Sequence, residues 1–132
     1  MMLAIDDSLL DGLEVRAAGS PRLRAALDLR TTPGDGSQRM LNALLPGTNV
    51  PIHRHPATAE TVLAVRGALT EVFYDGQGVE MSRHPLDAAH GPYGLQIPPG
   101  QWHTVEVTSP CVILEVKDGP YAPAAPEDMM NL

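Results

Sequence analysis

Short apolar runs recur along the chain from residue 38 onward, and glycine and proline separate most of them. Several runs alternate apolar with polar side chains, which is typical of β-strands with one buried face. The pattern predicts strands over residues 39–45, 50–55, 61–65, 69–74, 95–97, 103–107 and 112–117. Short, regularly spaced strands of this kind indicate an all-β sandwich or barrel.

The first 37 residues follow a helical pattern instead. A helix capped by Asp6 or Asp7 is predicted through about residue 18, with a stripe of leucines on one face and Gly19 at its end. Pro21 at a first helical position predicts a second short helix to about residue 27. We therefore expect a helical extension over residues 1–37 packed on the barrel, a barrel over 38–118 and a proline-rich strap over 119–132.

Two stretches carry the candidate chemistry. His53 and His55 are two positions apart on an extended segment and so project from the same face. Glu60 begins the return strand after four residues, and His103 follows the turn Pro98-Pro99-Gly100. Three imidazoles and one carboxylate form the ligand set of a mononuclear transition-metal centre. The sequence predicts that these four side chains bind one divalent ion, either Zn, Ni, Fe or Mn.

These stretches also carry a family resemblance. The segment from Gly47 through His53-Arg54-His55 and Glu60 to Gly67 resembles the first conserved motif of the cupin superfamily, and residues 98–103 resemble the second. Over a longer span the chain is similar to the WbuC family of small cupin-fold metalloproteins. The features in common are Ser20-Pro21-Arg22, Gln38-Arg39-Met40, Pro46-Gly47, His53-Arg54-His55-Pro56 and residues 115–121.

The resemblance has implications for fold and role. It implies a single cupin barrel, the double-stranded β-helix or jelly-roll, that holds one metal ion. It also implies a connection with surface-polysaccharide biosynthesis, because WbuC-like proteins are sometimes encoded among genes for such sugars. The family's reaction is not established.

Several functions remain open from the sequence. One is an enzyme acting on a sugar or nucleotide-sugar, in which the ion polarises a carbonyl or hydroxyl group for isomerisation or epimerisation, or binds O₂ as an Fe(II) dioxygenase. Another is a non-catalytic small-molecule-binding or sensor module, and a third is a barrel that the ion only stabilises. No second carboxylate or histidine stands beside the ligands as a general base, which weighs against an isomerase. No catalytic residue is therefore assigned.

Six polar or aromatic residues are candidates for holding a small molecule beside the ion. They lie on predicted strands or next to them, where one face of each strand turns inward. The set is Arg39, Asn42, Tyr74, Gln96, Trp102 and Lys117. The other two histidines, His84 and His90, fit no ligand spacing and are expected in a loop.

Composition narrows the choice of partners. A net charge of −7 argues against binding to nucleic acid. The sequence has no apolar run of membrane-spanning length, and its acidic first 20 residues lack the pattern of a signal peptide. We expect a cytoplasmic protein with a small-molecule ligand and no membrane partner.

The leucine stripe of the N-terminal helix is expected to cover a sheet or to form a homodimer interface.

Overall fold

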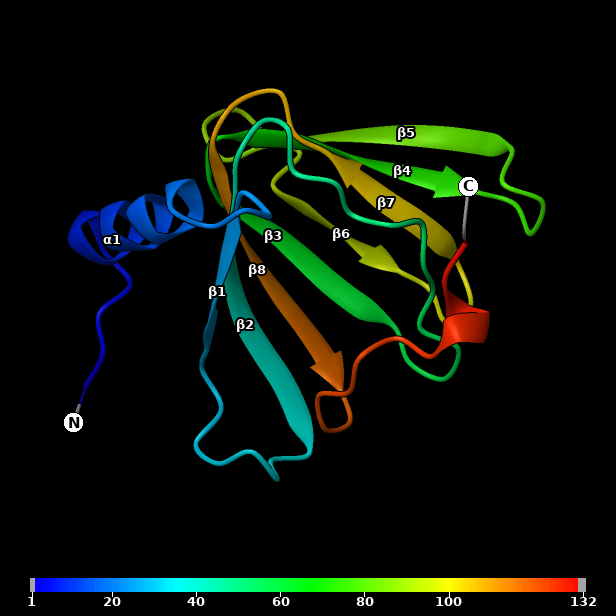
Figure 1. The fold of residues 1–132 in the computed structure, drawn as a ribbon, viewed down its shortest axis with the longest axis horizontal. Helices are drawn as coiled ribbons and strands as arrows, with labels where there is room; N and C mark the ends of the chain where they lie inside the picture. The colour runs from blue at the N-terminus through cyan, green and yellow to red at the C-terminus, as the bar shows by residue number, and fades with distance from the viewer. Residues whose placement is uncertain (1, 131–132) are drawn as a thin grey trace.

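The structure, a computed structural model, describes residues 2–130. Two antiparallel sheets face each other and one helix lies outside them (Figure 1). The elements are α1 (Asp7–Ala18), β1 (Arg24–Asp28), β2 (Ser37–Leu44), β3 (Glu60–Arg66), β4 (Ala68–Tyr74), β5 (Glu80–Asp87), β6 (Gly94–Ile97), β7 (Trp102–Glu106), β8 (Cys111–Asp118) and the 3₁₀ helix η1 (Pro126–Asp128). This arrangement confirms the predicted all-β barrel with an N-terminal helix. None of the helices within residues 2–130 is long and apolar enough to cross a membrane.

The strand order brings distant parts of the sequence together. The larger sheet has the order β1-β2-β8-β3-β6 and the smaller sheet the order β5-β4-β7. The last strand, β8, therefore lies between β2 and β3, and its inward side chains share one face with theirs. The two sheets lie close together near α1 and diverge toward η1 (Figure 1).

Strand alternation divides the apolar side chains between two cores. The core between the sheets consists of Leu44, Val62, Leu69, Leu86, Ile97, Cys111 and Ile113. On the opposite face of β2, Leu41 packs with Leu10 and Leu13 of α1 in the second core. The leucine stripe thus covers the outer face of the larger sheet, one of its two predicted placements.

Gly67 ends β3 as predicted, and its surroundings explain the residue type. Its backbone has φ +74°, in the left-handed region that residues with a Cβ rarely adopt. A Cβ at this position would lie 2.4 Å from the carbonyl oxygen of Pro110. Only glycine therefore lets β3 turn directly into β4 beside the start of β8.

Three local predictions are wrong. Residues 24–27, expected in a second helix, belong to β1, which pairs with β2 along its whole length. Residues 50–55 form no regular strand, and only His53 makes isolated bridges. His84 and His90 were expected in a loop, but His84 lies on β5, whereas His90 does lie in a turn. The two missed strands, β1 and β5, share a cause, because edge strands with one solvated face lack a strong apolar signal.

Candidate metal centre

Three histidines from two segments converge between the sheets. His53 and His103 lie directly opposite each other, and the backbone N–H of each donates to the carbonyl of the other at 3.0 and 2.9 Å. Side chains at such paired positions point to the same face, and the two ring centroids are 4.3 Å apart. The His55 ring lies 5.1 Å from that of His53 and 5.6 Å from that of His103. Each histidine offers a ring nitrogen, and these atoms all lie within 4.8 Å of one another.

Backbone carbonyls set the tautomers of two of these rings. Nδ1 of His53 lies 2.8 Å from the carbonyl oxygen of Pro51, and Nδ1 of His103 lies 2.9 Å from that of Gln101. A carbonyl only accepts, so each Nδ1 must carry the proton. The Nε2 atoms of His53 and His103 are then left with free lone pairs, as metal ligation requires.

Glu60, the first residue of β3, is not part of the three-histidine cluster but lies next to one of its members. Its Oε2 lies 2.7 Å from Nε2 of His55. The two atoms lack hydrogen-bond geometry, so within residues 2–130 this buried nitrogen has no hydrogen-bond partner. Two ligands about 2.1 Å from one ion and at right angles to each other lie about 3 Å apart. The close approach of these atoms therefore fits two neighbouring ligands of one ion.

Burial keeps the histidines neutral. Loss of solvent contact lowers the pKa of His53 and His55, and the positive charge of Lys117 lowers that of His55 further. Burial and the neighbouring imidazoles lower the pKa of His103 to about 3. All three rings are thus in the form that binds a metal ion at neutral pH.

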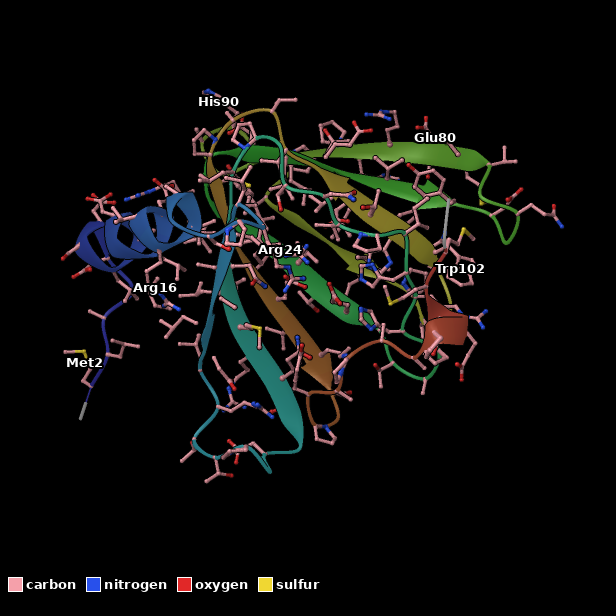
Figure 2. All side chains as sticks on the ribbon, viewed as in Figure 1. Met2, Arg16, Arg24, Glu80, His90 and Trp102 are labelled. Carbon is pink, nitrogen blue, oxygen red and sulfur yellow. The ribbon has the colours of Figure 1, made fainter. Side chains whose placement is uncertain are left out.

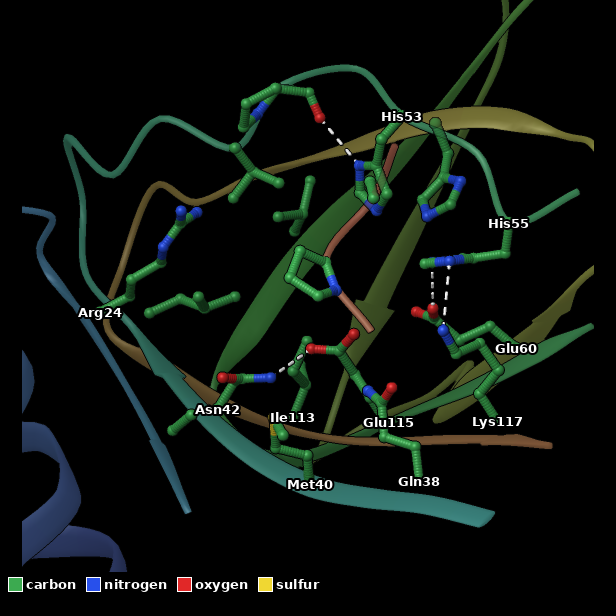
Figure 3. A pocket seen from close by; sticks show the side chains of 18 of the residues that line it. Arg24, Gln38, Met40, Asn42, His53, His55, Glu60, Ile113, Glu115 and Lys117 are labelled. Atoms are coloured by element: carbon green, nitrogen blue, oxygen red, sulfur yellow. Dashed lines mark hydrogen bonds and ion pairs between the residues drawn. The ribbon is translucent and has the colours of Figure 1, made fainter. Parts of the chain in front are cut away.

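The four candidate ligands line a cavity of about 450 Å³ between the sheets. Glu71 on β4 also lines this cavity, as does Glu115 on β8, which Figure 3 labels. The Glu115 carboxyl group accepts a hydrogen bond from the side-chain amide of Asn42. Glu71 is 3% exposed, and its Oε2 has no hydrogen-bond partner among residues 2–130. The cavity therefore holds two acidic side chains beyond the candidate ligands.

These two carboxyl groups have strongly shifted acidities. Burial, together with the negative charge of nearby Glu60, raises the pKa of Glu115 to about 8. Burial and the charges of Glu115 and Glu60 raise the pKa of Glu71 well above its ordinary value. A group that titrates near neutral pH can both give and take a proton. The expectation that no second carboxylate stands beside the ligands is therefore wrong.

Sequence reasoning missed Glu71 and Glu115, although a signal was present. Both side chains occupy inward positions of apolar strands, between Leu69 and Phe73 and between Ile113 and Lys117. A carboxylate at an inward position of a buried strand is uncommon without a partner or a role. The alternation of inward and outward side chains along these apolar strands, together with an acidic residue at an inward position, could have identified them.

The six small-molecule candidates separate into two groups. Asn42 and Lys117 line the cavity, and Lys117 Nζ lies 3.4 Å from Nδ1 of His55. The other four are not part of its lining. Arg39 donates to Ser37 on the outside of the barrel, Gln96 is exposed on β6, Trp102 stacks against Arg54, and Tyr74 pairs with Trp102 across β4 and β7.

Arg54 connects the histidine segment to two other parts of the chain. Its Nε donates to Oδ1 of Asp128 at 2.9 Å, and its backbone N–H donates to the Asp128 carbonyl at 3.0 Å. Its guanidinium group lies over the Trp102 ring, 4.6 Å from the centroid. Trp102 precedes His103, so Arg54 fixes the two ligand segments and the C-terminal η1 relative to one another.

We expect Arg54→Met to weaken metal binding about tenfold, as loss of groups that orient ligands commonly does. The barrel should remain folded because neither apolar core contains Arg54. Zinc titration against a competing chelator measures the affinity, and circular dichroism checks the fold. Arg83→Met is the matched control, because Arg83 pairs with Glu80 and Glu106 on the outside of the smaller sheet. Equal affinity in both variants would contradict the positioning role.

Several solved structures have a similar fold. The capsular polysaccharide assembling protein CapF from Staphylococcus aureus superposes with a TM-score of 0.67 at 22% identity, over 86% of this chain and 32% of CapF. Oxalate decarboxylase from Bacillus subtilis, a protein with Mn(II) centres, gives 0.60 at 19% identity over 77% of this chain and 27% of its own. A cupin-2 domain protein from Shewanella frigidimarina gives 0.56 at 19% identity, over 71% and 79%. This chain spans about a third of the length of CapF.

The fold is thus that of a single cupin barrel, and its histidine cluster is a candidate site for a divalent metal ion. By sequence the chain belongs to the family described as a domain of unknown function (DUF6016), whose model matches residues 5–86. That match includes β1 to β4 and three of the four candidate ligands, and His103 lies beyond it. Curated proteins give no sequence match.

Proposed function

We propose that this protein is a metal-dependent enzyme that moves protons on a small sugar or nucleotide-sugar. The observation that carries the proposal is the cavity that joins the four candidate ligands to the buried carboxyl groups of Glu71 and Glu115. A structural ion is enclosed by protein ligands, whereas a catalytic ion keeps a coordination position open toward a cavity. Convergent polar groups beside the donors favour the catalytic arrangement.

The residues divide the proposed chemistry among them. A divalent ion held by the three histidines and Glu60 would polarise a carbonyl or hydroxyl oxygen of the ligand. Glu115, held by the amide of Asn42, takes a proton from the carbon next to that carbonyl and returns it. The Lys117 ammonium group, next to His55, offsets the negative charge that develops on the ligand oxygen.

The substrate class rests on two further supports. Sugars present the hydroxyl and carbonyl groups that a polar cavity with an amide and carboxyl groups can hold. The resemblance to the WbuC family and the shared fold with CapF, a capsular polysaccharide assembling protein, favour the same class. These two similarities support the sugar class, and neither depends on the geometry of the cavity.

Exchange with heavy water tests the proposal. Metal-loaded protein is incubated in D₂O with a panel of sugars and nucleotide-sugars, and ¹H NMR follows the protons next to each carbonyl. We expect one substrate to exchange a carbon-bound proton for deuterium. The exchange should disappear after chelation and in Glu115→Gln, and persist in Glu127→Gln, whose side chain is exposed.

Other outcomes would identify the alternatives. Saturable binding of a sugar without exchange or turnover would point to a binding or sensor module. Consumption of O₂ by the iron-loaded protein would point to a dioxygenase. Either result would overturn the proton-transfer proposal.

A further inference from the structure

Some basic side chains of this protein form salt bridges with carboxylates and others do not. The chain has nine lysines and arginines, all within residues 2–130. Most of them contact carboxylates at salt-bridge distance. These paired residues are Arg30, Arg39, Arg54, Arg66 and Arg83. Four basic residues in the described part of the chain have no such partner.

Three of the four unpaired basic side chains line the same cavity. Arg22 precedes β1, Arg24 opens β1, and Lys117 lies near the end of β8. The fourth, Arg16, is exposed on α1 outside the cavity (Figure 2). The same cavity is lined by Glu60, Glu71 and Glu115, but within residues 2–130 no carboxylate lies at salt-bridge distance from any of these three cations. Unpaired cations that gather in a cavity favour an anionic ligand.

Arg24 and Lys117 lie on different sides of the cavity. Lys117 lies beside His55 and Glu60, whereas Arg24 lies on the side away from them (Figure 3). The Arg24 guanidinium makes one long hydrogen bond, from Nη1 to the carbonyl oxygen of Asn49 at 3.4 Å. Its other donors make no hydrogen bond within residues 2–130, so they are available to a ligand.

We infer that the ligand carries a carboxylate or phosphate group, and that Arg24 and Arg22 bind this group while the opposite end of the ligand reaches the candidate metal donors. A guanidinium group presents parallel N–H donors that match the oxygens of both anions. For the role of the ligand's opposite end, at the candidate metal donors, the inference rests on the proposed function. The anion site itself depends only on the two arginines and the cavity.

Three probes with one carbon skeleton test the anion site. Glycerol 3-phosphate, glycerate and glycerol are titrated into the full chain, both zinc-loaded and chelated, and amide chemical shifts in NMR report affinity and location. We expect at least one anionic probe to bind about tenfold tighter than glycerol, or more, in both forms of the protein. The tighter of the two anions then identifies the group as phosphate or carboxylate.

Matched variants assign the effect to the cavity. Arg24→Gln should weaken binding of the anionic probe about tenfold, whereas Arg16→Gln should leave it unchanged. Arg22→Gln provides a second test if Arg24→Gln does not fold. Equal affinity for all three probes, or equal behaviour of the Arg24 and Arg16 variants, would overturn the inference.

The same titrations distinguish this inference from the proposed function. Anion binding that requires zinc and ignores Arg24 would show that the ion alone holds the anion, and would also overturn the inference. Arginine-dependent binding with no proton exchange on any sugar would instead support the anion site and count against the proposed enzyme.

Discussion

His55→Ala is expected to abolish metal loading while the barrel stays folded. Removing one of four ligands should weaken binding by more than about 100-fold, since even groups behind the ligands contribute 10–100-fold. The fold should survive because most of its stability comes from the two apolar cores, which do not include His55. The melting temperature should fall modestly, by the stabilisation that bound metal adds.

Elemental analysis and thermal melts of wild-type, chelated and His55→Ala protein measure these effects. His90→Ala is the control, because His90 (Figure 2) is an exposed histidine in a turn and belongs neither to the histidine cluster nor to the cavity lining. Loss of the β-sheet circular dichroism signal in both metal-free samples would contradict the account. It would show that the ion is structural.

Glu71→Gln is expected to stabilise the metal-free protein at pH 8 and to have little effect at pH 4. The pKa of Glu71 is raised in the folded protein, so above about pH 4.5 the unfolded chain releases a proton that the folded chain retains. The free energy of unfolding therefore falls as pH rises from that value toward the folded pKa. A glutamine side chain does not titrate, so the variant lacks this decrease. We expect its free energy of unfolding at pH 8 to exceed that of the wild-type protein by about 2 kcal/mol.

Calorimetry of both chelated proteins across this pH range measures the difference. The buried histidines oppose the effect below about pH 6.5, because unfolding lets them bind protons there, but they contribute equally to both proteins. Glu127→Gln, at an exposed position, should give a difference near zero at every pH. A stabilisation by Glu71→Gln that is the same at pH 4 and pH 8 would contradict the raised pKa.

The part of the site that sequence could predict is the part that local geometry determines. His53 and His55 lie two residues apart, and Glu60 follows at the start of β3, so short-range spacing brings them together. His103 was identifiable from the turn before it. The structure adds the pair of backbone hydrogen bonds between His53 and His103, which spacing alone does not predict.

The rest of the cavity depends on strand order. Glu71 and Glu115 come from β4 and β8, which belong to different sheets, and only the packing of those sheets brings the two side chains into one cavity. Arg24 was expected in a helix, and its position on the cavity wall follows from the pairing of β1 with β2. Edge strands such as β1 and β5 carry too little apolar pattern to be recognised by period alone.

We predict that His53, His55, Glu60 and His103 bind one divalent ion. The most direct test is a crystal structure of protein purified without added metal, with diffraction recorded on both sides of the absorption edge of the element that elemental analysis finds. The account predicts one anomalous peak about 2.0–2.2 Å from a nitrogen of each histidine and an oxygen of Glu60. A well-ordered structure in which any two of these side chains lie too far apart to share an ion, or in which the ion binds elsewhere, would contradict it.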